Sequence, residues 1–255
     1  MMLPVLVLAG SRDGERDPLA QLGNVSHKAL LPIAGIPMIE RVVRVLEDTP
    51  DLGPIWVSIE KPSCLEFLGK RIRVLEAAST PSESVAKALD EIGTPCLITT
   101  ADHALLSSQW IQEFLEKSRA SQADLTAGVA SDQAIRRDVP NTKRTYIRLS
   151  DLTFSGCNLF YFHDARARSV VTLWQNLQRN RKRPLKMAWT LGIPTLLRFI
   201  LRQLDTSGIE QRIAHLTHAS VKIVTLQDGK ASIDVDKVSD FHLVNDLLNE
   251  EKKQS

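Results

Sequence analysis

The sequence predicts an α/β fold of three layers, with helices on both faces of a mostly parallel, mixed central sheet. Short buried apolar runs alternate with segments of helical periodicity, and the connections between them are short. Such alternation is typical of a parallel sheet covered on both faces. The composition, 43% hydrophobic and 24% charged over 255 residues, is that of a soluble globular protein and excludes disordered, fibrous and disulfide-rich classes.

The first half of the chain alternates predicted strands and helices. Leu3–Leu8 is a continuous β-branched and leucine run, which is typical of a fully buried strand. A polar loop from Gly10 to His27 separates it from a helix that begins at Met38, where apolar residues recur at helical spacing. The next predicted elements are, in order, strand Ile55–Ile59, helix Ser63–Leu68, strand Ile72–Leu75, helix Ser82–Ile92 with Ser82 as candidate N-cap, strand Pro95–Thr100, helix Ser107–Ser118 and strand Leu125–Val129.

The second half is less regular, and we expect a single domain, 1–255, with a helical insertion at about 164–218. Asp164–Gln178 has a clear helical pattern, and the segment Pro184–Leu204 is predicted to be mostly helical. The other predicted elements are strands Arg144–Leu149, Leu159–Phe162, Val221–Leu226 and Ala231–Val235, and the closing helix Ser239–Leu248.

Charge, cysteine content and hydropathy exclude several function classes. With 32 basic against 30 acidic residues, the net charge of +2 is too small for a general nucleic-acid-binding protein. The three cysteines, Cys64, Cys96 and Cys157, form no C-x-x-C pair, so neither a zinc site nor a disulfide framework is predicted. The apolar N-terminus lacks the basic region of a signal peptide, and no run reaches the ~18 apolar residues of a membrane span. We therefore expect a cytoplasmic protein.

Two neighbouring segments are candidates for binding phosphate. The loop Leu8-Ala9-Gly10-Ser11-Arg12 follows the first strand, where turned backbone amides and Arg12 could bind phosphate oxygens. It matches neither common nucleotide-binding glycine motif, and a solvated surface loop is the alternative. In the second segment, Ser26–Ile39, two prolines bracket a glycine and hold Lys28 beside this loop.

Three carboxylates are candidate metal ligands. Asp102 directly follows the predicted strand Pro95–Thr100, where a carboxylate is well placed to hold a hard divalent cation. Asp234 and Asp236 alternate along a segment predicted to be extended, so their side chains point to one face. The alternatives are a helix-capping role for Asp102 and a polar strand edge for the other two. Capping is disfavoured because Ser107 or Ser108 can cap the next helix.

Together these four segments resemble the NTP-transferase superfamily. Its pattern is a strand with an L-A-G-G loop, then K-x-L-L-P-x-x-G-x-P-L-I, a strand ending in D-x-P-L-L, and a later D-x-D-T-P-E-D-L. The MobA-like branch, which contains molybdenum cofactor guanylyltransferases, is similar, as are sugar-phosphate nucleotidyltransferases. The resemblance covers about the first 130 residues and the C-terminal segment. It implies a GT-A-like (Rossmann-like) nucleotidyltransferase fold, with a nucleotide-binding half, 1–130, and an acceptor-binding half, 131–255.

The resemblance also implies roles for individual residues. Lys28, Asp102 and Arg12 are expected to be catalytic, and Asp102 and Asp234 to hold Mg²⁺ (or Mn²⁺). The acceptor is expected at Gly156, Asn158 and Asp236. The nucleotide is expected at Leu8, Ala9, Gly10, Ser11, Arg12, Lys28, Ser84 and Ala101. The implied reaction transfers NMP from a nucleoside triphosphate to a phosphorylated small molecule and releases pyrophosphate.

The sequence departs from the family pattern at three places. Ser11 replaces the second loop glycine, His103-Ala104 stands where x-Pro is usual, and Lys237-Val238 replaces Thr-Pro. Two alternatives therefore stay open: a GT-A glycosyltransferase that uses a nucleotide sugar, and a nucleotide-binding protein of the same fold without catalysis.

The segment 179–186 carries five basic residues in eight and precedes a long apolar pattern. It is predicted to be a solvated turn before a core or dimer-packing helix, a site for a phosphate-rich acceptor, or an interfacial helix that contacts anionic lipid. We expect a monomer or homodimer, with no nucleic-acid partner and no transmembrane segment.

Overall fold

The computed structural model describes residues 2–254 except 12–15, 141, 181–189 and 191. Its centre is an eight-stranded mixed sheet in the order β10-β7-β9-β6-β1-β4-β5, with β8 paired to β9. β9 is antiparallel to β6, β7 and β8, and the other neighbours are parallel. The strands are β1 Leu3–Leu8, β4 Leu52–Ile59, β5 Arg73–Glu76, β6 Cys96–Thr100, β7 Leu125–Ser131, β8 Ile147–Arg148, β9 Thr153–Phe162 and β10 Val221–Leu226.

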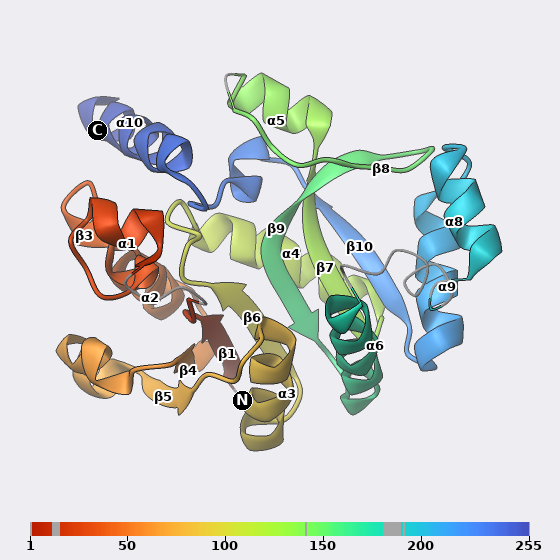
Figure 1. The fold of residues 1–255 in the computed structure, drawn as a ribbon, viewed down its shortest axis with the longest axis horizontal. Helices are drawn as coiled ribbons and strands as arrows, with labels where there is room; N and C mark the ends of the chain where they lie inside the picture. Colours follow the sequence, from red (N-terminus) through yellow and green to blue (C-terminus); the bar gives the residue numbers. More distant parts are fainter. Residues whose placement is uncertain (1, 12–15, 141, 181–189, 191, 255) are drawn as a thin grey trace.

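Helices cover both faces of this sheet (Figure 1). The α-helices are α1 Pro18–Leu22, α2 Met38–Asp48, α3 Pro81–Ile92, α4 Ser108–Ser121, α5 Asp132–Asp138, α6 Arg168–Arg179, α8 Ile193–Ile200, α9 Thr206–Thr217 and α10 Val238–Gln254. Shorter 3₁₀ segments are η2 Lys28–Leu30, η3 Pro62–Arg71, η4 Ala165–Ala167 and η5 Gly229–Ser232, and a two-stranded hairpin is formed by β2 Pro32–Ile33 and β3 Ile36–Pro37. The three-layer α/β prediction is confirmed.

The side chains of the central strands alternate between two hydrophobic cores. Val5 and Val7 of β1 face a core with α2, α4 and α10, whereas Leu6 faces a core with α3 and α6. The same alternation separates Leu97 from Ile98 in β6. Because both faces of these strands are buried, they are continuous apolar runs, the pattern that predicted a parallel sheet.

Helix termini confirm one predicted cap and correct another. Ser107 caps α4, since its hydroxyl accepts a hydrogen bond from the Trp110 amide at 3.3 Å. For α3 the prediction of Ser82 is wrong: Thr80 is the N-cap and accepts from the Glu83 amide. The helix begins at Pro81, whose fixed φ suits the first helical position. Ser82 is instead buried in the first turn and donates to Gln178 of α6 at 2.6 Å.

Two further expectations are corrected near the sheet. The predicted strand Ala231–Val235 is wrong, because η5 occupies its start and the Asp228 carboxylate caps that turn. The Val235 amide then donates to the carbonyl of Asp102 at 3.0 Å, which fixes the segment beside the end of β6. β9 begins at Thr153, six residues earlier than predicted, and the expected loop Gly10–His27 contains the short helix α1.

The segment Pro184–Leu204 is described only in part, and its described helix is α8. Most of the basic segment 179–186 lies outside the described residues. None of the helices in the described chain has the length and apolar character needed to cross a bilayer. Both halves of the chain supply strands to the one large sheet, and the division at residue 130 stays a prediction.

Candidate functional site

A cleft of about 510 Å³ opens at the carboxyl ends of β1 and β4, beside the start of α3. In α/β sheets, ligands bind at this edge. The cleft is lined by Leu8, Gly10, Ser11, Asp17, Lys28, Ser58, Glu60, Ala77, Ala78, Ser79, Thr80, Pro81, Ser84 and Asp236. Six of the predicted site residues are therefore brought to a single cavity: Leu8, Gly10, Ser11, Lys28, Ser84 and Asp236.

Lys28 connects three segments that are distant in sequence. It begins η2, and its Nζ donates to Asp102 Oδ2 at 2.7 Å and to Asp236 Oδ1 at 3.0 Å. Burial alone would lower the pKa of Lys28, but the two carboxylates outweigh it and raise the pKa above its usual value. The ammonium is thus held in its charged form at the cleft.

Asp102 lies in the turn that follows β6, as predicted. Burial opposes its ionisation, yet the Lys28 ammonium lowers the pKa of Asp102 below its usual value. One oxygen accepts from Lys28, while Oδ1 is buried and has no hydrogen-bond partner in the described part of the chain. A buried carboxylate oxygen without a partner costs free energy unless a ligand binds it.

Asp234 is buried in a different set of contacts. Its Oδ1 pairs with the Arg144 guanidinium, and its Oδ2 accepts from Asn158 Nδ2 at 2.8 Å. Burial and the nearby charge of Asp102 raise the pKa of Asp234 despite this pairing. Asp234 and Asp236 therefore do not converge on one point: Asp236 pairs with Lys28, and Asp234 with Arg144.

A bulge aims Asn158 at Asp234. The register between β7 and β9 shifts at this point, and Asn158 has a φ of 50° in the left-handed region, which asparagine tolerates. Gly156 lies on the same strand with open space beside its α-carbon. Its predicted contact with an acceptor stays a prediction.

The remaining predicted residues are not all at the cavity surface. Ala9 and Ala101 are buried. The Ala101 amide donates to the carbonyl of Leu8 at 2.9 Å and joins the end of β6 to β1, whereas the Ala9 amide donates to the carbonyl of Ser58 in β4 at 2.9 Å. Ser84 lines the cleft, and its hydroxyl accepts from the Ala78 amide at 2.9 Å. Arg12 lies outside the described residues.

Sequence reasoning missed Arg144 and Glu60. Arg144 lies outside every motif, so no spacing could have paired it with Asp234. Glu60 lines the cleft directly after β4, and its position among acidic residues at strand ends could have revealed it. A β-carbon at Gly10 would meet Glu60 Oε1 at 2.9 Å, so a larger residue there would displace the exposed Glu60 side chain.

The carboxylates beside Lys28 form an incomplete donor set for a divalent cation. Within the described residues, no group of three or more histidine, cysteine, aspartate or glutamate side chains is arranged as a complete metal site. Mg²⁺ is usually held by one or two carboxylates together with substrate phosphates and water. The unpaired Oδ1 of Asp102 fits that incomplete type of site; Asp234 fits it only where the cation displaces Arg144 or Asn158 from one of its oxygens.

His103 is not suited to acid–base chemistry in this arrangement. It is buried and stacks on Trp110, with ring centroids 6.0 Å apart. Burial lowers the pKa of His103 to about 4, so the imidazole is neutral at physiological pH.

A family model for the MobA-like NTP transferase domain matches residues 5–183, which is most of the chain. The chain belongs to this family. Its members are nucleotidyltransferases, so this NTP transferase is an enzyme of EC 2.7.7 type and its general activity is nucleotidyl transfer. No curated protein sequence matches it.

Solved structures support the same fold. A hypothetical transferase from Thermus thermophilus is 27% identical, with a TM-score of 0.81 over 94% of this chain and 100% of that one. A CMP-2-keto-3-deoxy-manno-octonic acid synthetase complexed with CTP is 14% identical, with a TM-score of 0.60 over 98% and 99%. A 2-C-methyl-D-erythritol 4-phosphate cytidylyltransferase, also from Thermus thermophilus, is 16% identical, with a TM-score of 0.54 over 98% and 100%. The predicted GT-A-like fold and family are confirmed.

Proposed function

We propose that this NTP transferase transfers NMP from a nucleoside triphosphate to a phosphorylated small molecule, with Mg²⁺ (or Mn²⁺), and releases pyrophosphate. The acceptor is a sugar phosphate, a phospho-alcohol or a phosphorylated cofactor precursor. The observation that carries the proposal is Lys28, a charged ammonium held by Asp102 and Asp236 at a cleft of about 510 Å³. That volume lies in the range of small-molecule sites.

The reaction needs few chemical groups from the protein. An oxygen of the acceptor phosphate attacks the α-phosphorus, and the bond to the β-phosphate oxygen breaks, so pyrophosphate leaves with the bonding electron pair. Because a phosphate nucleophile is already ionised at neutral pH, no general base is required. A neutral, buried His103 agrees with this.

The protein's task is to bring two anions together and to stabilise the charge that shifts between them. Lys28 is expected to leave its carboxylate partners for the phosphates, since an ammonium on a flexible stem can turn from one anion to another. Asp102 and Asp234 would hold the cation, which when bound neutralises phosphate oxygens and orients them. Backbone amides near Gly10 and Ser11 would cradle the triphosphate.

The acceptor side of the proposal rests on Asn158, Gly156 and Asp236. Asn158 is held by Asp234 at a bulge, and Asp236 lines the cleft on the side of Lys28. An amide and a carboxylate are suited to binding the hydroxyl groups of a sugar or phospho-alcohol.

Binding is tested first by thermal unfolding with ATP, CTP, GTP and UTP, each with and without Mg²⁺. CTP leads the series because one fold relative is a synthetase complexed with CTP and another is a cytidylyltransferase. A nucleotide at about 100 times its Kd should add about 2.7 kcal/mol of stability. We expect one nucleotide to stabilise the chain only with Mg²⁺, and Lys28→Met to abolish that shift. Lys70→Met, at an exposed lysine of η3, is the matched control and should leave it unchanged.

Pyrophosphate release separates the alternatives. With the stabilising nucleotide, a panel of phosphorylated sugars and alcohols should release pyrophosphate if the proposal is correct. Stabilisation by a nucleotide with no release from any acceptor would favour the non-catalytic alternative, to which Ser11 in the loop points. Stabilisation by nucleotide sugars alone would favour the glycosyltransferase alternative.

A further inference from the structure

Helix α8 exposes an unusual concentration of apolar side chains. The described chain has eleven exposed large hydrophobic residues, and five of them fall in the nine residues 193–201. None of the residues of α8 is buried. Single exposed hydrophobic residues are normal, whereas a contiguous exposed group marks an interaction site. We call this group the α8 patch: Ile193, Leu197, Phe199, Ile200 and Leu201.

The spacing places most of the patch on one stripe. Ile193, Leu197, Ile200 and Leu201 follow the i, i+4, i+7, i+8 pattern of a single helix face. Ile200 and Leu201 are 64% and 62% exposed. Arg198 and Arg202 follow Leu197 and Leu201 in the chain; Arg198 pairs with Asp205 at 3.9 Å, and Arg202 lies past the end of the helix with a φ of 55°.

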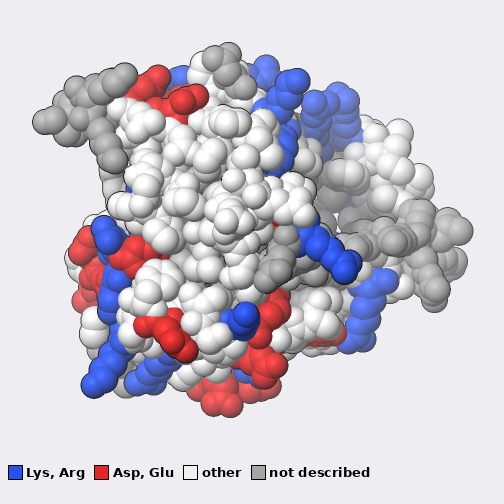
Figure 2. All heavy atoms as spheres, turned by 60° about the vertical axis from the view of Figure 1, so that its left-hand side comes forward, with Lys and Arg blue, Asp and Glu red and all other residues white. Residues whose placement is uncertain are grey.

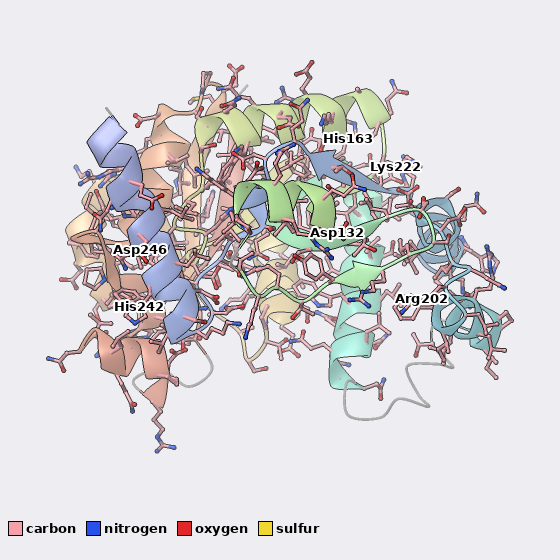
Figure 3. All side chains as sticks on the ribbon, turned by 90° about the horizontal axis from the view of Figure 1, so that it is seen from above. Asp132, His163, Arg202, Lys222, His242 and Asp246 are labelled. Carbon is pink, nitrogen blue, oxygen red and sulfur yellow. The ribbon has the colours of Figure 1, made fainter. Side chains whose placement is uncertain are left out.

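The surrounding sequence is strongly basic. Residues 165–204 contain nine of the 32 basic residues and none of the 30 acidic ones, although Asp164 and Asp205 border the segment and pair with Arg166 and Arg198. The rest of the chain carries 23 basic against 30 acidic residues. The net charge of +2 conceals this asymmetry. On the side of the molecule with α1, α2 and α10, Figure 2 shows acidic and basic side chains close together. Figures 1 and 3 place α8 and Arg202 at the end of the molecule opposite α10.

We infer that the α8 patch docks on the surface of an anionic lipid bilayer. A helix with apolar residues on one stripe and arginines beside it lies in the bilayer interface, with the stripe below the headgroups and the arginines among the anionic lipids. An anionic bilayer therefore binds both features of this region, the exposed Leu and Ile side chains and the positive charge.

Other occupants satisfy only one feature. A nucleic acid would pair with the arginines but leave Leu197 and Ile200 in water. A second copy of the chain in a two-fold dimer would cover the apolar stripe but would place two equally basic regions face to face. The inference rests on α8 and its charges alone, independently of the nucleotide cleft.

Flotation of the full chain with vesicles tests the inference. We expect binding to vesicles of 70% phosphatidylcholine and 30% phosphatidylglycerol, little binding to pure phosphatidylcholine, and weaker binding at high salt because anionic headgroups are screened. Leu197→Asp combined with Ile200→Asp should reduce partitioning at least about tenfold, because charged side chains are expelled from the apolar interface. Arg198→Gln and Arg202→Gln should each reduce it about fivefold.

Control variants distinguish binding through the α8 patch from binding through any exposed hydrophobic residue. Phe67→Asp changes an equally exposed hydrophobic residue, 54% exposed in η3, and should leave binding unchanged. Circular dichroism melts confirm that each variant is folded. Equal binding to both vesicle types, or equal loss in Phe67→Asp, overturns the inference. The inference is also overturned if light scattering shows that the wild-type protein is a dimer and the α8 variants are monomers, and if these variants still bind vesicles.

Discussion

Two clusters of ion pairs in this molecule differ in how completely they are satisfied. In the cleft cluster, Lys28 bridges Asp102 and Asp236, yet Asp102 Oδ1 stays buried with no partner in the described chain. In the α2 cluster, both carboxylate oxygens of Glu40 accept from Arg71, at 3.0 and 2.9 Å, and Arg44 adds a third bond at 2.6 Å.

This difference indicates that the α2 cluster has a structural role, which we call framework, whereas the cleft cluster is a ligand site. The α2 cluster is complete, so it fastens η3 to α2 and has little capacity for a ligand. The cleft cluster joins segments 74 and 208 residues apart and retains an unused acceptor. Other buried polar atoms of the described chain also lack partners, among them Arg41 Nη2 of α2, so the unpaired oxygen indicates a ligand site only together with the cleft beside Lys28. Substitutions in the two clusters should therefore affect different properties.

The largest effect is expected for Asp102→Asn. Asparagine keeps the shape but removes the charge that the proposed cation needs, so pyrophosphate release should fall about 10²–10³-fold, the loss seen when one electrostatic stabiliser is removed. The free energy of unfolding should fall by about 1–3 kcal/mol, because the largely buried Lys28 ammonium keeps only the exposed Asp236 as a charged partner.

Steady-state pyrophosphate release and urea unfolding, measured on the same preparation, test the expected loss of turnover and the expected change in the free energy of unfolding. Asp90→Asn, at an exposed carboxylate of α3 that pairs with Arg168, is the control and should affect neither strongly. Full turnover in Asp102→Asn would show that the unpaired oxygen does not mark the site.

Arg144→Met is expected to have the next largest effect. It would leave the buried Asp234 carboxylate with only Asn158 as partner, and breaking a buried pair from one side costs about 3–5 kcal/mol. Unfolding in urea measures the loss. Adding Asp234→Asn should recover part of it, because the uncompensated charge is then removed. An additive double variant would show that the two side chains are not coupled.

Glu40→Gln should act on stability and leave turnover unchanged. Burial opposes ionisation of Glu40, but hydrogen bonds from Arg44 and Arg71 outweigh it and lower the pKa of Glu40 below its ordinary value near 4.5. A carboxyl with a lowered folded-state pKa contributes stability above its unfolded-state pKa. That contribution is lost as the pH falls through the folded-state pKa.

We therefore expect Glu40→Gln to cost about 2 kcal/mol at pH 7, as for a hydrogen bond to a charged group. The wild-type advantage should shrink as the pH falls below about 4.5. Melting curves from pH 7 to pH 3 on both proteins measure this difference. An advantage that persists unchanged at pH 3 would contradict the assignment of the cluster as a complete, ionised framework.

Much of the fold was predictable because its information is local. The strands Leu3–Leu8 and Cys96–Thr100 are continuous apolar runs, and the carboxyl ends of parallel strands meet at one edge. That rule predicted that Gly10 and Asp102 would come together, and the proline-bracketed segment together with the family resemblance added Lys28. Two predictions were wrong for local reasons: Pro81 moves the start of α3 to the Thr80 cap, and the Asp228 cap turns Gly229–Ser232 into η5.

The acceptor side was less predictable because distant segments determine its geometry. Asn158 reaches Asp234 only because β9 bulges against β7, and a bulge depends on the register of two strands. Arg144 is paired with a carboxylate 90 residues away by a loop whose path no motif specifies. The site residues with no local signal are those whose position is set by long-range contacts.

Ser84→Ala is expected to have the smallest effect. It extends the comparison because Ser84 both stabilises the local backbone and lines the cleft. Its hydroxyl accepts from the Ala78 amide at 2.9 Å, and both residues line the cavity. Losing this bond should cost about 1 kcal/mol, both in the free energy of unfolding and, through a displaced cleft wall, as about a fivefold rise in KM for the nucleotide. Ser121→Ala removes a comparable acceptor for the Ala123 amide at the end of α4, and should lower stability alone. Ser84→Ala could likewise change stability without changing KM. In that case the segment between β5 and α3 has only a structural role, and the nucleotide is recognised by the carboxyl end of β1 and by Lys28.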